Sequence, residues 1–287
     1  MNYSFLIGES PSTTGRSHHL WNYVYKSLGM DCQMIALDAP TNEEFSLVME
    51  DVIHNSSFFG GCITNPWKSL IGFRESFDLS CSLSHHSYNV LAPSLSNEFR
   101  FSAHNTDSYG FWTSISPYLS CVNNMVMLGF GGTAKAIIAE ALDYPIQVYI
   151  LTRSDVPTKE QFLYEHPNVN FVNQVDIDNF FEKKESIFPF LLVNATNCGV
   201  LSKSTVVPTH FNRILQDLPI PHLFFDIVHT PLLTSSMMHC QFAGIPVLGG
   251  LHMNTLQAIR AFSLVHPDIP LGLVTSMMKA ANSTINQ

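Results

Sequence analysis

A short apolar segment that runs into a glycine-rich turn constrains this chain more than any other part of it. Residues 126–128 are apolar, residues 129–132 read Gly-Phe-Gly-Gly, and a stretch of small residues typical of a helix begins at Thr133. A strand that turns through glycines into a helix is the opening of a βαβ unit. The segment therefore predicts an α/β fold with parallel strands.

The spacing of the small residues favours one class of ligand. Gly129 allows a tight bend, Gly131 lets the backbone approach a pyrophosphate, and Ala134 stands where a small residue lets the helix pack on the strand. The free N–H groups of the first helical turn, around Gly132 and Thr133, would face the phosphates. The turn predicts a dinucleotide site, although such turns also occur for packing alone.

A second apolar run, after the helix, bears on the same site. Residues 146–151 alternate as in a strand and lead into Thr152, Arg153 and Ser154, where a βαβ unit meets the adenosine ribose. An arginine there accommodates the 2′-phosphate of NADP, so Arg153 favours NADP, while Asp155 keeps NAD open. All three residues at the strand end are expected to contact the cofactor.

A third apolar run, residues 188–200, carries two polar residues where its strand should end. These are Asn194 and Thr196. Neighbouring parallel strands end at one edge of a sheet, so both residues are expected on the nicotinamide side of the cofactor.

Length and composition fit a two-domain enzyme. The 287 residues are 46% hydrophobic, enough for two cores of about 100 to 150 residues each. The chain has 14 basic and 23 acidic side chains and no basic run, which makes nucleic acid and anionic membranes poor partners. Its six cysteines lack CxxC spacing, so neither a disulfide framework nor a metal site is expected. The amino terminus has neither a basic segment nor a long apolar one, which predicts a cytoplasmic protein.

Strand-like and helix-like segments also alternate before the glycine turn. Residues 3–8 and 32–37 read as strands, and a helix between them should end at Gly29. Thr41, with Glu44 three residues later, has the pattern of a capping box. These segments predict an α/β domain ahead of the nucleotide domain, with the loop-rich residues 81–105 near the boundary.

Seven sequence blocks resemble one enzyme family. "GGCITNPWK" is similar to the G-x-x-V-T-x-P-x-K of shikimate dehydrogenases, and "HNTDSYG" to their G-x-N-T-D-x-x-G. "LGFGGTAKA", "TRS" and "NATNCGV" resemble the family's L-G-x-G-G-x-x-[RK]-A, N-R-T and N-A-T-x-x-G-[ML]. "FDIVHTPLLT" is similar to D-x-x-Y-x-P-x-x-T, and "GLHMNTLQAIRAF" to G-x-x-M-L-x-x-Q-A-x-x-x-F. The blocks follow the family order from about residue 60 to the end.

The resemblance implies a fold and an activity. Residues 1–106, completed by 250–287, would form an α/β substrate-binding domain, and residues 107–249 a doubly wound, Rossmann-type NADP-binding domain. The implied reaction interconverts 3-dehydroshikimate and shikimate, a small polyhydroxylated cyclic carboxylate, with NADP as cofactor and NAD possible. Monomer and homodimer both stay open.

The resemblance also places a catalytic pair at Lys68 and Asp107. Reducing a ring ketone builds negative charge on its oxygen, which a cationic or proton-donating group must meet. Lys68 can be that group, with Asp107 holding the ammonium and bonding a neighbouring substrate hydroxyl. Each residue also has an ordinary reading, as a surface lysine and as a helix N-cap.

Other positions carry over from the same motifs. Four polar residues would bind the ring hydroxyls, and Gly250, which opens the last block, would lie near the cofactor. The four are Thr64, Asn89, Asn105 and Gln257.

The chain departs from the family where that family binds the substrate carboxylate. The family loop G-x-P-x-x-x-S-x-S-P-x-x-H-N has two serines, at which this chain has Gly15 and Ser17. One hydroxyl is therefore missing, unless Thr13 or Thr14 replaces it. The family's carboxylate-binding tyrosine is His229 here, whose imidazolium form would add a positive charge.

These departures place the chain nearest a divergent shikimate dehydrogenase-like branch and leave other activities open. The alternatives are a dehydrogenase of quinate or a related cyclitol acid, and a nucleotide-binding regulatory homologue with little turnover. A methylene-tetrahydrofolate-type dehydrogenase fits the NTD and GLxMxxxQA blocks less well.

Overall fold

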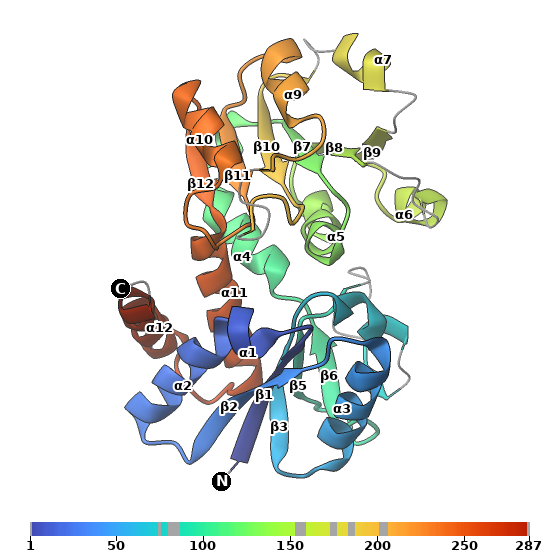
Figure 1. Cartoon of the computed structure of the whole chain (residues 1–287). Coiled ribbons are helices and arrows are strands. Elements are labelled where there is room, and N and C mark those ends of the chain that lie inside the picture. The colour runs from blue at the N-terminus through green and yellow to red at the C-terminus, as the bar shows by residue number, and fades with distance from the viewer. Residues whose placement is uncertain are drawn as a thin grey trace. The chain divides into compact units, whose positions relative to one another are not determined.

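The computed structural model describes residues 2–73, 76–79, 87–152, 159–172, 177–182, 187–200 and 206–285. The chain divides into a first unit, Met1–Gly110 with Thr255–Gln287, and a second unit, Phe111–Asn254. Each unit holds a six-stranded sheet with helices beside it (Figure 1). The expected two-domain α/β class is confirmed, and the expected limits, 1–106 with 250–287 and 107–249, lie within a few residues of this division.

The second unit is built on a parallel sheet of order β12-β11-β10-β7-β8-β9. This order reverses between β7 and β10, as in a doubly wound sheet, and ligands of such sheets bind where the strands on either side of the reversal end. The strands are β7 (Asn124–Leu128), β8 (Gln147–Leu151), β9 (Val169–Val172), β10 (Phe190–Asn194), β11 (Leu223–Asp226) and β12 (Val247–Gly249).

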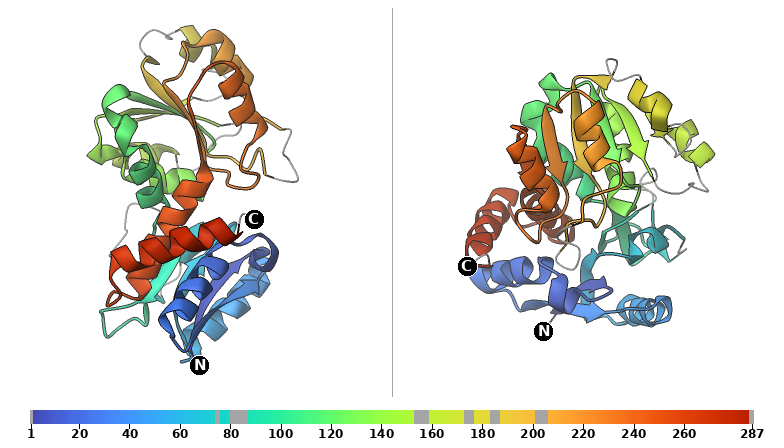
Figure 2. Two further views of the ribbon diagram at one scale, coloured as in Figure 1. Left: turned by 90° about the vertical axis from the view of Figure 1, so that its left-hand side faces the viewer. Right: turned by 45° about the horizontal axis from the view of Figure 1, so that its top comes forward.

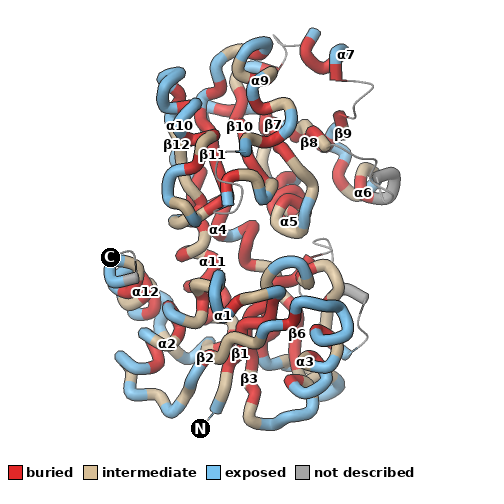
Figure 3. The backbone as a smooth tube through the Cα atoms, in the orientation of Figure 1, coloured by how far each residue is buried: buried red, intermediate tan, exposed pale blue. Residues whose placement is uncertain are grey.

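Helices cover both faces of this sheet (Figure 2). Met125 and Met127 of β7 belong to one apolar cluster, whereas Val126 and Leu128 belong to another. All five residues of β7 are buried (Figure 3). Because both faces of the strand are buried, its residues are apolar at every position except the first. The helices are α5 (Gly132–Ala139), α6 (Lys159–Glu165), α7 (Ile177–Glu182), α9 (Phe211–Asp217) and α10 (Ser235–Phe242), with 3-10 turns η3 (Ser116–Cys121) and η4 (Ala141–Asp143).

The first unit has a mixed sheet of order β2-β1-β3-β5-β6-β4. Strand β1 pairs in parallel with β2 and β3, and β5 pairs antiparallel with β3 and β6. The polar stretch 81–105 supplies β5 and β6, so it belongs to this sheet, and the chain passes to the second unit after it. The strands are β1 (Asn2–Gly8), β2 (Cys32–Asp38), β3 (Phe58–Ile63), β4 (Phe77–Asp78), β5 (Val90–Pro93) and β6 (Phe101–His104).

Local sequence signals set several helix ends of the first unit. Gly29 ends α2 with a left-handed φ of 64°, and Thr41 and Glu44 form the expected capping box of α3. None of the described helices is long and apolar enough to span a bilayer. The helices are α1 (Pro11–Thr14), α2 (Ser17–Leu28), α3 (Asn42–His54), the 3-10 helix η1 (Trp67–Phe73) and α12 (Leu271–Ile285), while α4 (Asp107–Ile115) and α11 (Gly250–Val265) run across the division between the units.

Segments from both ends of the chain form one core of the first unit. Trp21 of α2 packs edge-on against Phe262 of α11, with 5.0 Å between ring centroids. Val274 and Met278 of α12 are fully buried in the same cluster. One face of this sheet is therefore covered by helices that lie more than 200 residues apart in the sequence.

Candidate active site

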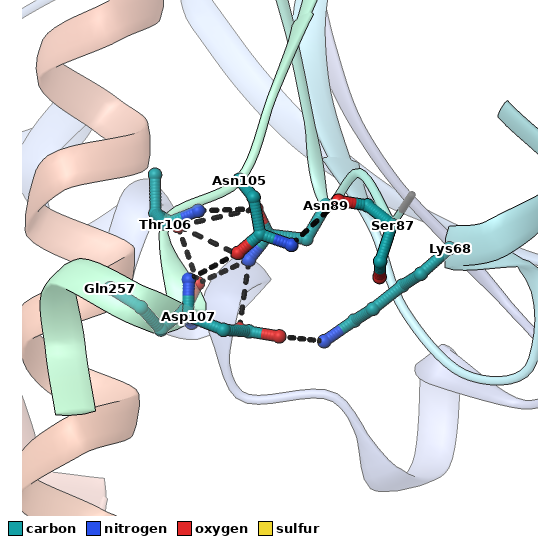
Figure 4. A network of polar contacts seen from close by, with 7 residues as sticks. All are labelled: Lys68, Ser87, Asn89, Asn105, Thr106, Asp107 and Gln257. Carbon is teal, nitrogen blue, oxygen red and sulfur yellow. Dashed lines mark hydrogen bonds and ion pairs between the residues drawn. The ribbon is translucent and has the colours of Figure 1, made fainter. Parts of the chain in front are cut away.

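A buried ion pair joins the two residues expected to be catalytic. Lys68 in η1 donates from Nζ to Oδ2 of Asp107 over 2.6 Å (Figure 4). The two side chains are 11% and 7% exposed, so Lys68 is not a surface lysine. Asp107 is the first residue of α4, where the helix dipole favours a negative charge. The pair therefore presents a fixed ammonium in weakly screening surroundings.

Asn89 holds the other carboxylate oxygen of Asp107. Its Nδ2 donates to Asp107 Oδ1 over 2.9 Å and to Thr106 Oγ1 over 3.1 Å. Its Oδ1 accepts from the backbone N–H of Thr106 over 2.8 Å. With both oxygens of Asp107 engaged, the carboxylate cannot rotate away from Lys68 without losing a hydrogen bond.

Gln257 and Asn105 complete this network. Gln257 of α11 accepts at Oε1 from Thr106 Oγ1 over 3.2 Å, and Asn89 Nδ2 lies 3.4 Å from the same oxygen. Asn105 Oδ1 accepts from the N–H of Asp107 over 2.8 Å, which caps the start of α4. Asn105 thus satisfies one of the free N–H groups at the start of α4. The structure brings together five of the residues expected in the site: Lys68, Asn89, Asn105, Asp107 and Gln257.

A buried thiol lies beside the ion pair without competing for the proton. Burial raises the pKa of Cys62 to about 12, with Lys68 lowering this pKa and Asp107 raising it. The thiol therefore stays protonated and uncharged at neutral pH.

The loop expected to bind the substrate carboxylate leaves no room for a side chain at Gly15. A Cβ atom there would lie 2.5 Å from Leu6 Cδ2 and 2.6 Å from the carbonyl oxygen of Pro11, so a serine does not fit without movement. The hydroxyls of Thr13 and Thr14 donate to the carbonyl of Ser10 within α1, over 3.1 and 2.8 Å. This arrangement counts against their replacing the missing serine hydroxyl.

Two further expected residues lie apart from the hydrogen bonds of the ion pair. Ser17 is buried at the start of α2. Thr64 follows β3, donates its N–H to Ile7 and accepts from the N–H of Trp67. Within the described part of the chain, no hydrogen bond joins Ser17 or Thr64 to the Lys68–Asp107 network, so their contact with substrate stays a prediction.

The glycine turn of the second unit has the shape that its sequence predicts. Gly129 has a φ of 95°, and a Cβ there would lie 2.7 Å from Thr196 Cγ2. Gly131 is the N-cap of α5, and a Cβ there meets no atom within 4 Å. The helix begins at Gly132, one residue before the expected Thr133, and Ala134 is fully buried against the sheet. The turn thus leaves open space beside Gly131 at the N-terminus of α5.

Asn194 uses its side chain to shape a loop. It is fully buried, donates to Asp226 Oδ1 and to the carbonyl of Cys198, and accepts from the N–H and hydroxyl of Thr196. Asp226 also accepts from Thr234 Oγ1 over 2.7 Å, and burial raises its pKa to about 6. The side chain of Asn194 is therefore engaged in shaping this loop, and its contact with the cofactor stays a prediction.

The remaining expected residues belong to the second unit. A Cβ at Gly250 would lie 2.1 Å from the carbonyl oxygen of Ile227, so glycine is required there by close backbone approach. His229 is half-buried, and its Nδ1 lies 3.1 Å from Thr230 Oγ1. Thr152 follows β8 and is half-buried. Arg153 and Ser154 lie outside the described residues.

Thr106 and Ser87 are members of this site that the sequence did not single out. Thr106 is fully buried and bonds both Asn89 and Gln257. Its position in the middle of the Asn-Thr-Asp block is the sequence feature that could have identified it as a site residue. Ser87 is fully buried, and its carbonyl accepts from Asn105 Nδ2 over 2.8 Å. It precedes a strand in a polar stretch, where no pattern distinguishes it from a loop serine.

Comparisons with known proteins agree with the motifs. No protein-family model matches the chain. The shikimate dehydrogenase (NADP+) of Streptococcus thermophilus is 26% identical over 274 residues, which are 92% of each chain. Shikimate dehydrogenase 1 of Peptoclostridium difficile has a TM-score of 0.78 at 20% identity and covers 98% of this chain and 97% of its own.

A second solved structure extends the likeness in fold. The shikimate 5-dehydrogenase of Thermus thermophilus, in complex with NADP(H) and shikimate, has a TM-score of 0.74 at 22% identity over 98% of this chain and all of its own. Sequence and fold therefore agree along nearly the whole length. The resemblance drawn from the motifs is confirmed, and the chain is a relative of the shikimate dehydrogenases.

Proposed function

We propose that the chain is an NADP-dependent dehydrogenase that interconverts 3-dehydroshikimate and shikimate. The observation that carries the proposal is the buried Lys68–Asp107 pair, held by Asn89 and, through Thr106, by Gln257. A protein that only binds a nucleotide has no need of an ammonium fixed in this way. The relatives named as NADP+-dependent shikimate dehydrogenases support the same reaction.

The second unit fits a dinucleotide. Gly131 leaves free space at the N-terminus of α5, and the reversal of strand order lies between β7 and β10. When bound, NADP would accept or supply the hydride. Gly129, Gly131, Gly132 and Thr133 would hold its pyrophosphate, and Arg153 its 2′-phosphate.

Lys68 would act on the substrate oxygen. As a carbonyl is reduced, its oxygen gains negative charge, which the ammonium meets with a hydrogen bond and then with a proton. Asp107 keeps the ammonium in place through the 2.6 Å contact, and Asn89 keeps Asp107 in place. In the oxidation direction the neutral amine takes the proton from the alcohol.

Gln257 is suited to hold a ring hydroxyl. Its Oε1 accepts from Thr106, while in the described part of the chain its Nε2 has no hydrogen-bond acceptor. A side-chain amide has two N–H donors on that nitrogen, so a substrate hydroxyl can accept from it. Ser17 and His229 are proposed to bind the carboxylate, and Thr64, Asn89 and Asn105 to contribute to hydroxyl binding. The protein is proposed to work as a monomer or homodimer.

Steady-state kinetics test this function. Purified protein is given shikimate or quinate with NADP+ or NAD+, and absorbance is followed at 340 nm, with Lys68→Ala as the inactive control. We expect turnover with shikimate and NADP+. Faster turnover with quinate would change the substrate assignment to quinate. This comparison matters because Gly15 replaces a serine that the family uses to bind the substrate carboxylate. The absence of turnover with every pair would leave a nucleotide-binding protein and refute the proposal.

A further inference from the structure

The side-chain hydroxyl of Ser87 is buried without a hydrogen-bond partner among the described residues. The residue itself is fully buried. A buried hydroxyl without a partner lowers stability, so its presence in a folded protein calls for an explanation such as a catalytic role.

The backbone around Ser87 is fixed from two sides of the site. Its carbonyl accepts from Asn105 Nδ2 over 2.8 Å, and the N–H of the next residue, Tyr88, donates to the carbonyl of Lys68 over 2.9 Å. Figure 4 shows the hydroxyl pointing toward the side chain of Lys68 and away from the amides of Asn89 and Asn105. Ser87 is thus attached to the segment that carries the ammonium and to the loop that caps α4.

We propose that Ser87 is a positioning residue for Lys68, whose hydroxyl bonds the Lys68 nitrogen during the reaction. This inference rests on the proposed function. An ammonium has three N–H donors. Asp107 accepts one of them, the substrate oxygen accepts a second, and Ser87 accepts the third.

The chemistry of a hydroxyl suits both states of the lysine. During reduction the proton moves from Lys68 Nζ to the substrate oxygen, and the N–H bond electrons stay on nitrogen as a lone pair. A carboxylate can only accept, so Asp107 can bond an N–H of either form but offers nothing to the lone pair of the neutral amine. The Ser87 hydroxyl accepts from the ammonium and donates to the neutral amine, so it holds Nζ in place before and after the transfer.

The test compares Ser87→Ala with Ser236→Ala. Ser236 of α10 is also buried with no partner for its hydroxyl among the described residues, but it belongs to the second unit. Removing an unsatisfied hydroxyl should raise the melting temperature of either variant by about 2 to 4 °C. Only Ser87→Ala should lower kcat, by about tenfold or more, with the KM for NADP+ unchanged.

Each outcome decides the question. A higher melting temperature with a lower kcat in Ser87→Ala alone supports the proposal. A lower melting temperature would mean that Ser87 bonds a structural partner, and an unchanged kcat would mean that the hydroxyl does not act on Lys68; either result overturns it. If the wild-type protein shows no turnover at all, the proposed function is refuted, and the role of Ser87 in that reaction is refuted with it.

Discussion

Substituting the two members of the buried ion pair singly and together tests the physical basis of the site. In Asp107→Asn the amide is nearly isosteric and can still accept from Asn89, but Lys68 loses the counter-ion that lies 2.6 Å away. In Lys68→Met the carboxylate loses its cation. The side chains are only 11% and 7% exposed, so each single substitution should cost about 3 to 5 kcal/mol of unfolding free energy.

The double variant should cost less than the two single costs combined, because it leaves neither charge buried alone. We expect a coupling energy of at least about 2 kcal/mol between positions 68 and 107. Urea unfolding followed by tryptophan fluorescence measures it, since Trp21 and Trp67 both belong to the first unit. All three variants should lose about 100-fold or more in turnover.

The chain contains a matched control for this cycle. Arg213 and Asp178 are also 2.6 Å apart, but their side chains are 38% and 74% exposed. The cycle of Arg213→Met and Asp178→Asn should give a coupling energy well below that of the buried pair, because water screens exposed charges. Additive costs at positions 68 and 107, within about 0.5 kcal/mol, would show that water screens that pair and would refute the reasoning.

Three further predictions concern other parts of the chain. Arg153→Ala should cost about 1.5 to 3 kcal/mol of NADP+ affinity by calorimetry and leave NAD+ affinity unchanged, and equal losses would contradict its role at the 2′-phosphate. Arg100 donates to four carbonyls between the end of α3 and the start of β3, those of Val52, Ile53, Asn55 and Phe58. Arg100→Ala should therefore lower the unfolding free energy by about 2 to 4 kcal/mol, and a change under about 0.5 kcal/mol would contradict this. Burial lowers the pKa of His266 to about 4, below the unfolded value of about 6.5, so stability should be full above pH 6.5 and fall by about 2 kcal/mol as the pH drops to about 4, allowing for partial exposure. His266→Phe should weaken this acid sensitivity in urea titrations, and an unchanged pH dependence would locate it elsewhere.

Local signals predicted the parts of this protein that depend on a few neighbouring residues. The turn at Gly129, the cap at Gly29 and the capping box at Thr41 each follow from backbone geometry or from one side chain bonding three residues along. Lys68 and Asp107 were paired through family motifs, and the structure shows the contact between them.

The hydrogen bonds that distant segments share could not be read from the sequence. Thr106 matters because Asn89 and Gln257 both reach it, and the inward turn of Asn194 depends on Asp226 in the next strand. Which atom of a polar side chain faces a ligand, and which faces the protein, is decided by such contacts. For this reason the sequence indicates that Asn194 ends its strand but not that its side chain supports the loop that follows.

The discontinuous first unit has a consequence for how the chain is made. Gln257 is synthesised 168 residues after Asn89, and Phe262, which packs on Trp21, comes later still. At about 5 to 20 residues per second, the segment before Gly110 waits roughly 10 to 30 seconds for the helices that cover one face of its sheet. The second unit is complete by then, so it can fold while the ribosome is still working. The apolar surface around Trp21 and Val24 is exposed during that interval, which makes the nascent first unit the part of this chain most in need of a chaperone.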